Sequence, residues 1–251
     1  MNCMAYILLL VFLPIWALGQ SLLQDSVVNL FMIKVNYTVQ IPFADMADRF
    51  GVNSSLGMGI GGKLGKNVLI GAEGNFLFGR KVREPNVLHH IVDREGFLIG
   101  SSGLYTDYAF SEKGFNLIAH GGKIIAFRKP NKNSGLLLLA GAGYLQHKIN
   151  IEVDASEAPM LSREYKKGYD RLTSGFMLSQ FIGYSYLDSK KKRLNFYFGV
   201  EIQEGFTKNR RSWNYDQNRK DDRMRKDILV GFRLGWIIPF YFTQTEKYYY
   251  Y

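Results

Sequence analysis

The sequence predicts an all-β fold, an eight-stranded antiparallel up-and-down transmembrane β-barrel, and three observations lead to this prediction. The 251 residues contain 16 Tyr, 18 Phe and 26 Gly against 6 Pro, a composition that favours strands and turns over helices. Eight segments alternate between apolar and polar residues with a period of two. The connections between these segments are alternately long and short, as in a barrel whose long loops share one rim.

An uncharged apolar run precedes the first expected strand. It extends from Met4 to Leu18, and Ala17 and Gly19 are the small residues that a signal peptidase requires, so we expect residues 1–19 to be a signal peptide. No Lys or Arg precedes Lys34, which leaves a membrane-anchored N-terminus as the alternative. Cys3 lies within the expected signal peptide, so the barrel domain, residues 20–251, should contain no disulfide and no cysteine-bound zinc.

The first four strands are expected over residues 31–41, 56–61, 68–79 and 115–120. Odd positions of the first are apolar, whereas Lys34 occupies an even position among Asn, Thr and Gln. The second alternates Leu, Met and Ile with Gly, and the third sets Phe and Ile against Gly, Glu73 and Asn75. In the fourth, Phe and Leu alternate with Asn and His120. Each segment therefore has one apolar face.

The last four strands are expected over residues 136–147, 173–186, 194–203 and 227–238. The first of these is apolar on both faces, so its prediction rests on the flanking turns. The other three alternate aromatic and aliphatic residues with Gly, Ser and a few polar residues that include Glu201, Gln203 and Arg233.

Long and short connections alternate along the whole chain. The long loops are expected over residues 42–54, 80–113, 154–171 and 208–225, and the short turns over 65–67, 128–134 and 188–193. An even number of strands places both ends of the barrel at the short-turn rim, which faces the periplasm in bacterial outer-membrane barrels, and makes the long loops extracellular.

The size of the apolar side chains decides which face points outward. A soluble lipocalin-type barrel would turn them inward, but an eight-stranded lumen has no room for so many aromatic rings. We therefore expect the apolar faces to contact lipid and the opposite faces to fill the lumen. Buried charges must be paired, which predicts an interior polar network of Lys34, Glu73, Asn75, His120, Glu201, Gln203 and Arg233.

An expected signal peptide followed by eight amphipathic strands resembles the small outer-membrane barrels of the OmpA/OmpX type. The aromatic-rich strands look most like barrel proteins of Bacteroidota, and the blocks YKKGYDRLTSGF (165–176) and EGFTKNRRSWN (204–214) look like features that recur in one such group. The resemblance covers essentially all of residues 20–251 and implies residence in the bacterial outer membrane, in contact with lipid and lipopolysaccharide.

Motifs for catalysis or cofactor binding do not have the structural context that they require. Residues 57–62 match G-x-G-x-x-G but lie within an expected strand instead of before a helix, which excludes a dinucleotide site. His89 and His90 are adjacent, and adjacent residues chelate one metal ion poorly. We predict no enzyme activity, no cofactor and no metal. The least favoured alternative is a lipid-modifying site at the rim that uses Ser101, Ser102 and His90.

The last long loop is the most basic segment of a chain whose formal net charge is +10. Arg210, Arg211, Trp213, Arg223 and Arg225 are its candidate residues for binding an anion or a partner, because arginine forks beside aromatic rings suit phosphate groups. For an exported barrel the available polyanion is lipopolysaccharide or an acidic protein, not nucleic acid. The alternative interpretation is a solvated loop whose charges bind nothing.

Three classes of function follow from these observations. A structural or surface-interaction barrel, with loops that bind lipopolysaccharide or a protein partner, is favoured. The alternative is an accessory subunit of an envelope machine such as type IX secretion, followed by the rim enzyme. A solute channel is not expected, because side chains fill an eight-stranded lumen and passage would require the inner charge network to rearrange.

Overall fold

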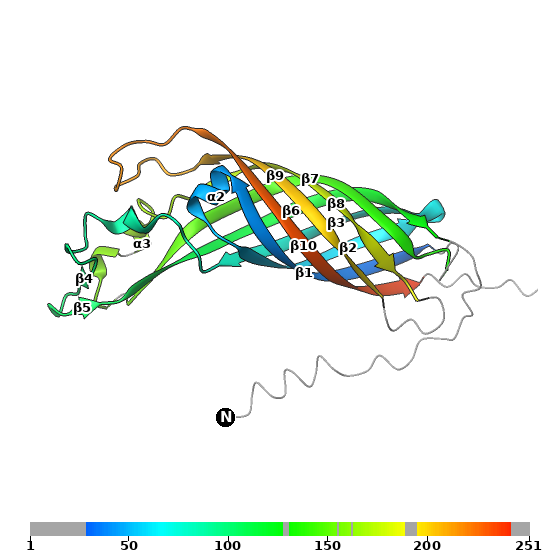
Figure 1. Cartoon of the computed structure of the whole chain (residues 1–251), viewed down its shortest axis with the longest axis horizontal. Helices are drawn as coiled ribbons and strands as arrows, with labels where there is room; N and C mark the ends of the chain where they lie inside the picture. Colours follow the sequence, from blue (N-terminus) through cyan, green and yellow to red (C-terminus); the bar gives the residue numbers. More distant parts are fainter. Residues whose placement is uncertain (1–28, 128–130, 155, 162, 189–194, 242–251) are drawn as a thin grey trace, which may run out of the picture.

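The chain folds into one closed antiparallel barrel (Figure 1). The computed structural model describes residues 29–127, 131–154, 156–161, 163–188 and 195–241. The barrel strands are β1 (Leu30–Ala44), β2 (Asn53–Leu64), β3 (Val68–Gly79), β6 (Tyr108–Ala126), β7 (Gly135–Val153), β8 (Thr173–Tyr186), β9 (Phe196–Asn209) and β10 (Met224–Tyr241). Each pairs with its neighbours in sequence, and β1 pairs with β10 from Leu30↔Tyr241 to Ala44↔Asp227. The predicted eight-stranded up-and-down barrel is confirmed.

The long connections meet at one end of the barrel, which we call the long-loop rim, and the turns meet at the short-turn rim (Figure 1). The long loops contain α2 (Asp45–Arg49), α3 (Arg163–Lys166), a small hairpin of β4 (Leu98–Ile99) with β5 (Tyr105–Thr106), and the 3-10 helices Pro85–Leu88 and Pro159–Leu161. A third 3-10 helix, Gly65–Asn67, forms the first short turn, where Lys66 has a φ of 64°.

Several strands extend beyond their predicted ends. Residues 108–113 belong to β6 instead of to the expected loop 80–113, because they pair with residues 148–153 of β7. Likewise β1 continues to Ala44, β9 to Asn209, and β10 begins at Met224, so three of the expected long loops are shorter than predicted. The expected signal peptide, residues 1–19, and parts of two expected turns lie outside the described residues.

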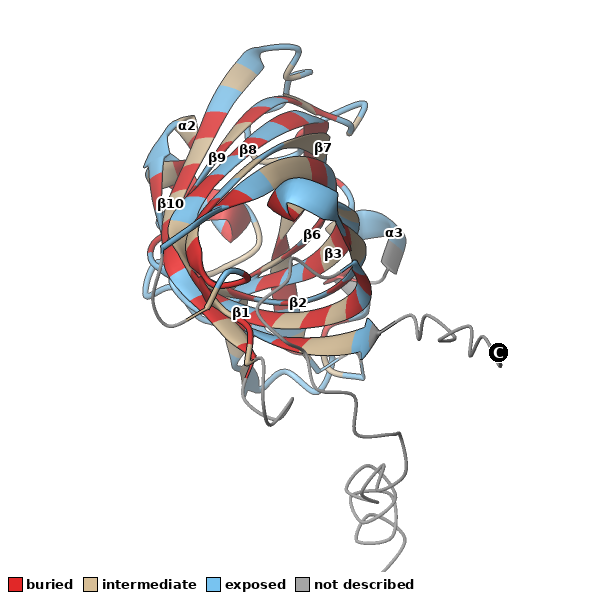
Figure 2. Cartoon of the chain, turned by 90° about the vertical axis from the view of Figure 1, so that its right-hand side faces the viewer, coloured by how far each residue is buried: buried red, intermediate tan, exposed pale blue. Residues whose placement is uncertain are grey.

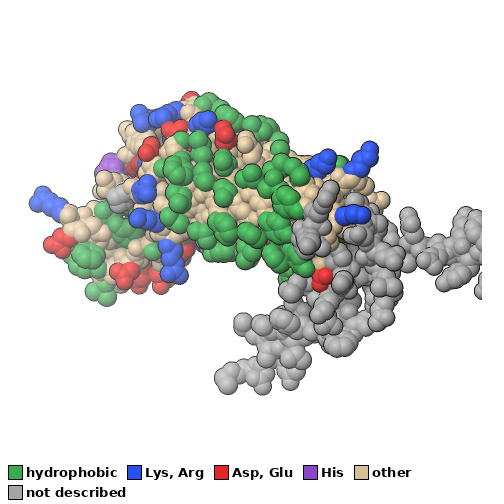
Figure 3. Space-filling model, turned by 45° about the vertical axis from the view of Figure 1, so that its right-hand side comes forward, with side chains coloured by type: hydrophobic (Ala, Val, Ile, Leu, Met, Phe, Trp, Pro, Cys, Tyr) green, Lys and Arg blue, Asp and Glu red, His purple; other side chains and the backbone are tan. Residues whose placement is uncertain are grey.

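The face of the barrel in Figure 3 has a broad apolar band with charged side chains gathered at both ends. Exposed apolar side chains occur on all eight barrel strands. Exposed and buried positions alternate along the strands (Figure 2). Large side chains such as Ile60, Phe76, Ile182, Phe232 and Trp236 are each more than half exposed, with values from 51% to 57%. The predicted outward orientation is therefore correct, and the barrel has the surface of a transmembrane β-barrel. No helix in the described part of the chain is long and apolar enough to cross a membrane.

The lumen has three layers, and two of them differ from the prediction. A central polar layer lies between two apolar clusters, whereas the sequence led us to expect small and polar residues throughout. The cluster toward the short-turn rim contains Leu30, Met32, Leu69, Ile124, Leu137, Phe181, Leu187, Tyr197 and Ile237. The cluster toward the long-loop rim includes Leu77, Leu145, Ile149, Met177 and Leu229 from the strands and Met46 and Phe50 from the first long loop. The large outward aromatic residues dominate the alternation in the sequence, so the inward apolar residues do not stand out from it.

Candidate functional site

The central polar network is built around Arg233 of β10. One terminal nitrogen of its guanidinium lies 2.7 Å from Glu73 Oε1 of β3, and the other lies 2.8 Å from Glu201 Oε1 of β9. The Arg233 Nε also donates to Thr38 Oγ1 at 3.3 Å. All three charged side chains are no more than 2% exposed. The predicted interior charges are thus brought together as a buried carboxylate–guanidinium–carboxylate triad.

Polar side chains extend the network across the lumen. Asn75 donates to Asn116 Oδ1 at 2.7 Å, and Asn116 donates to Gln203 Oε1 at 3.3 Å. Lys34 Nζ lies 2.7 Å from His120 Nε2, whose other ring nitrogen lies 4.0 Å from Glu73. Lys34 therefore reaches Glu73 through His120.

Glycine makes the room for this network on β2. A Cβ atom at Gly57 would overlap the Asn75 amide, and one at Gly59 would lie 2.7 Å from Glu73 Cβ. The alternation of Gly with large apolar residues in β2 therefore has a physical reason, since polar side chains from β3 occupy the space that side chains of β2 would fill.

A second polar cluster, which the sequence did not predict, lies nearer the long-loop rim. Asp227 Oδ2 lies 2.9 Å from His147 Nε2 and accepts a hydrogen bond from Thr207 at 2.5 Å. Arg49 of α2 enters the barrel, where its Nη1 donates to Thr173 Oγ1 at 2.9 Å and its Nη2 lies 3.7 Å from Asp227. Asp227 lies on the polar face of its strand, but no local signal shows that Arg49 folds inward.

The basic residues of the last long loop are divided between two places. Arg210 donates to Ser174 Oγ at 2.8 Å, and Arg211 donates to Asp170 Oδ1 at 2.8 Å, so both are held against the start of β8. Arg223 donates instead to Asp45 of α2 at 2.7 Å and Arg225 to Asp221 at 2.5 Å, and Trp213 is 44% exposed. The five predicted residues therefore do not form one continuous binding surface.

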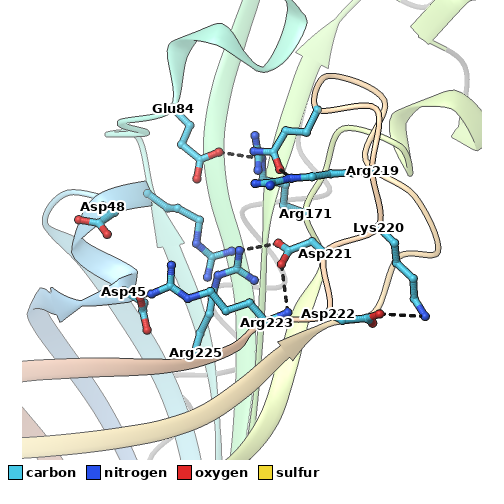
Figure 4. Close-up of a pocket in the computed structure, with 12 residues that line it drawn as sticks. Asp45, Asp48, Glu84, Arg171, Arg219, Lys220, Asp221, Asp222, Arg223 and Arg225 are labelled. Carbon is cyan, nitrogen blue, oxygen red and sulfur yellow. Dashed lines mark hydrogen bonds and ion pairs between the residues drawn. The ribbon is translucent and has the colours of Figure 1, made fainter.

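Arg223 and Arg225 line an open cavity at the long-loop rim, which we call the rim cavity (Figure 4). Its volume is about 530 Å³. It lies between α2 and the loop that joins β9 to β10. Its lining residues are almost all charged: Asp45, Asp48, Arg49, Glu84, Arg171, Gln217, Arg219, Lys220, Asp221, Asp222, Arg223 and Arg225.

Ion pairs across three loops shape the rim cavity. Arg171 pairs with Glu84 at 2.7 Å and with Asp216 at 2.6 Å, which ties the second and third long loops to the fourth. Arg225 pairs with Asp221 at 2.5 Å (Figure 4). Sequence reasoning missed Arg171, because its partners lie about 45 and 90 residues away and only the closed barrel brings the loops together.

Burial and the neighbouring arginines shift the pKa values of two loop carboxylates in opposite directions. Burial alone would raise the pKa of Asp221, but the hydrogen bond and the charge of Arg225 outweigh burial and hold this pKa below its ordinary value. Burial raises the pKa of Glu84, and Arg171 opposes that rise only in part. Asp221 therefore stays ionised in neutral solution as the fixed partner of Arg225.

The features considered for metal binding or catalysis have other roles in the described structure. His89 Nδ1 lies 2.8 Å from Asn86 O, and His90 Nε2 lies 3.0 Å from Asp216 O, so both rings contact backbone. Among the described residues no group of three His, Cys, Asp or Glu side chains could hold a metal ion. Ser102 donates to Glu157 at 2.6 Å and not to a histidine.

Comparisons with known proteins give structural neighbours only. No family model and no curated protein matches the chain. Neisserial surface protein A is similar with a TM-score of 0.45 and 11% identity over 84% of this chain and 97% of its own. Ail of Yersinia pestis, solved with the heparin analogue sucrose octasulfate, gives 0.41 and 10% over 84% and 99%. The outer membrane protein OprG from Pseudomonas aeruginosa gives 0.31 and 10% over 86% and 99%.

One of these neighbours is named as a surface protein, one as an attachment invasion locus protein and one as an outer membrane protein. The comparisons do not support the resemblance to Bacteroidota barrels, which stays a prediction.

Proposed function

We propose that this chain is an integral protein of the bacterial outer membrane, with a structural and surface-interaction role, whose sealed barrel presents ordered loops at the cell surface. The observation that carries the proposal is the apolar band around a fully closed ring of strands (Figure 3). In a bilayer every backbone N–H and C=O must be paired within the protein, and a barrel without edges meets that demand.

The filled lumen favours a scaffold over a channel. The polar network and the two apolar clusters occupy the lumen in layers, and the first long loop adds Met46 and Phe50 at the long-loop rim. Passage of a solute would have to break the Arg233 ion pairs, which lie in the middle of the lumen. We therefore expect the protein to work through its loops instead of through a pore.

The fourth long loop suits contact with lipopolysaccharide or an acidic protein surface. The Arg223 and Lys220 side chains are 71% and 59% exposed, and Trp213 and Tyr215 lie in the same loop at 44% and 42%. Such exposed charges attract a polyanion in a salt-dependent way.

Cysteine labelling tests the membrane orientation. Ser212→Cys places a thiol in the fourth long loop, and Lys66→Cys places one in the first short turn. The parent chain is the control for background labelling. We expect an impermeant maleimide to label Ser212→Cys on intact cells and Lys66→Cys only after permeabilisation. Labelling of Lys66→Cys on intact cells, or recovery of the protein in the soluble fraction, would contradict the proposal.

Binding to lipopolysaccharide tests the surface interaction. Lys220→Gln with Arg223→Gln should weaken binding of the detergent-folded barrel and reduce its dependence on salt, because both residues are exposed cations. Lys123→Gln removes an exposed cation near the short-turn rim and serves as the control. Equal binding by the parent and the double variant would leave the charged loop without this role.

A further inference from the structure

The rim cavity contains strong hydrogen-bond donors that the protein itself uses only in part. The side chain of Arg49 is only 4% exposed, yet its Nε has no hydrogen-bond partner and its Nη2 has only the ion pair with Asp227 at 3.7 Å. The Arg225 side chain is 14% exposed, and its Nη1 has no hydrogen-bond partner. Both residues line the cavity. Burying a guanidinium N–H without a hydrogen-bond acceptor costs free energy, unless a ligand or a water molecule accepts its hydrogen bond.

The chemistry of these donors indicates the group that they would bind. Two guanidiniums present planar forks of N–H groups, and a tetrahedral oxyanion such as a phosphate monoester accepts several such bonds at once. Arg219 lines the same cavity, and its Nε is engaged only by Gln217 at 3.2 Å in the described contacts. The cavity therefore offers a phosphate up to three guanidiniums.

The rest of the lining argues against a bare ion and against a long polyanion. A volume of about 530 Å³ lies within the range of roughly 300–1,000 Å³ that is typical of small-molecule sites. The lining has six basic and five acidic side chains. Among the acidic ones, Asp45 pairs with Arg223 and Asp222 with Lys220, whereas Asp48 is an exposed carboxylate. Such carboxylates accept hydrogen bonds from sugar hydroxyls but repel additional negative charge.

We propose that the rim cavity binds a phosphorylated sugar, with the phosphate on Arg49 and Arg225 and the hydroxyls on the carboxylates around them. The inference deepens the proposed surface interaction and rests on it only for the cellular location of the cavity. The sugar phosphate can be free or part of a lipid head group, since both present the same chemistry to the cavity.

Binding to the full barrel folded in detergent micelles tests this assignment. The probes are glucose 6-phosphate, glucose, inorganic phosphate and, in mixed micelles, lipid A. We expect glucose 6-phosphate to bind, inorganic phosphate to bind more weakly and glucose not to bind. Binding of lipid A alone, lost in Arg225→Gln, would support the proposal with the lipid head group as source.

Variants identify the residues that hold the ligand. Arg225→Gln should weaken binding of glucose 6-phosphate about tenfold, because it removes a charge-assisted hydrogen bond. Asp48→Asn, an exposed carboxylate of the lining, should weaken glucose 6-phosphate more than inorganic phosphate. Arg94→Gln, a loop arginine outside the cavity, is the control and should bind like the parent. Heat-dependent mobility on gels checks that each variant has folded.

Two results would overturn the proposal. If no phosphate-bearing probe binds, the unused donors are satisfied by water. If Arg225→Gln binds as the parent does, the ligand lies elsewhere. Either result leaves the cysteine labelling on cells unaffected, and an inverted labelling pattern would leave binding in micelles unaffected, so the two proposals fail separately.

Discussion

Replacing Arg233 with methionine is expected to be the most damaging single change in the lumen. The variant leaves Glu201 hydrogen-bonded to Ser179 at 3.1 Å, and leaves Glu73 with Asn75 at 3.4 Å and His120 at 4.0 Å. Removing one partner of a buried ion pair costs about 3–5 kcal/mol in the free energy of unfolding, because the remaining charge stays desolvated. Here one substitution leaves two buried carboxylates without their cationic partner, so the upper part of that range applies.

The matched control removes a cation from an exposed pair. Lys113 lies 3.4 Å from Glu152, and the two side chains are 44% and 57% exposed. Lys113→Met should therefore change the free energy of unfolding by about 1 kcal/mol or less.

Urea unfolding of the barrel in lipid vesicles, followed by tryptophan fluorescence, measures both variants. A third variant, Arg233→Met with Glu73→Gln and Glu201→Gln, removes all three charges and should recover much of the loss, since no uncompensated charge then remains. A loss for Arg233→Met no larger than that for Lys113→Met, or a triple variant less stable than the single one, would show that uncompensated buried charge is not the cause.

Three further predictions concern packing and the loops. Gly175→Ala should destabilise the barrel by about 1–3 kcal/mol, because its Cβ would overlap the backbone carbonyl of the neighbouring strand, whereas Gly62→Ala, with nothing within 4 Å, should be neutral in the same urea assay. Phe50→Ala removes a fully buried ring of the first long loop, and we expect a loss of about 3–5 kcal/mol together with faster proteolysis of that loop. The folded-state pKa of Asp221 lies below its ordinary value of 3.8, so its stabilisation of the loop is present above that pH and is lost as the pH falls through the lowered pKa. In the parent, protection of the fourth loop from hydrogen exchange should therefore decrease on acidification, whereas Asp221→Asn, which has no carboxyl group to protonate, should lose this pH dependence. A pH dependence that persists in the variant would be due to another group.

The sequence alone identified the fold because lipid and lumen impose a rule on each strand separately. A strand with one face in lipid must alternate with a period of two, and the stretch from Phe31 to Ile41 shows this without knowledge of any partner. The tight turn at Gly65–Asn67 was likewise predicted from local residues. Charges on the lumen face had to find partners, so Arg233 could be expected near glutamates before any contact was known.

The segment 136–147 shows where local reasoning ends. It is apolar on both faces, and only its pairing with β6 and β8 turns Leu137 and Leu145 inward and leaves Tyr144 exposed at 37%. The apolar clusters of the lumen have the same origin, because the residues that pack together come from strands on opposite sides of the ring.

Local residue patterns are enough to predict the number of strands, the face that all but one of them turn to lipid and the charged character of the last loop. Which charges meet depends on the closed barrel. Arg211 finds Asp170, Arg171 finds Glu84, and Arg49 turns into the lumen, because closure of the ring fixes the distances between loops that are far apart in the chain. Alternation is a local consequence of strand geometry, whereas ion pairs between loops depend on where the whole barrel places their ends.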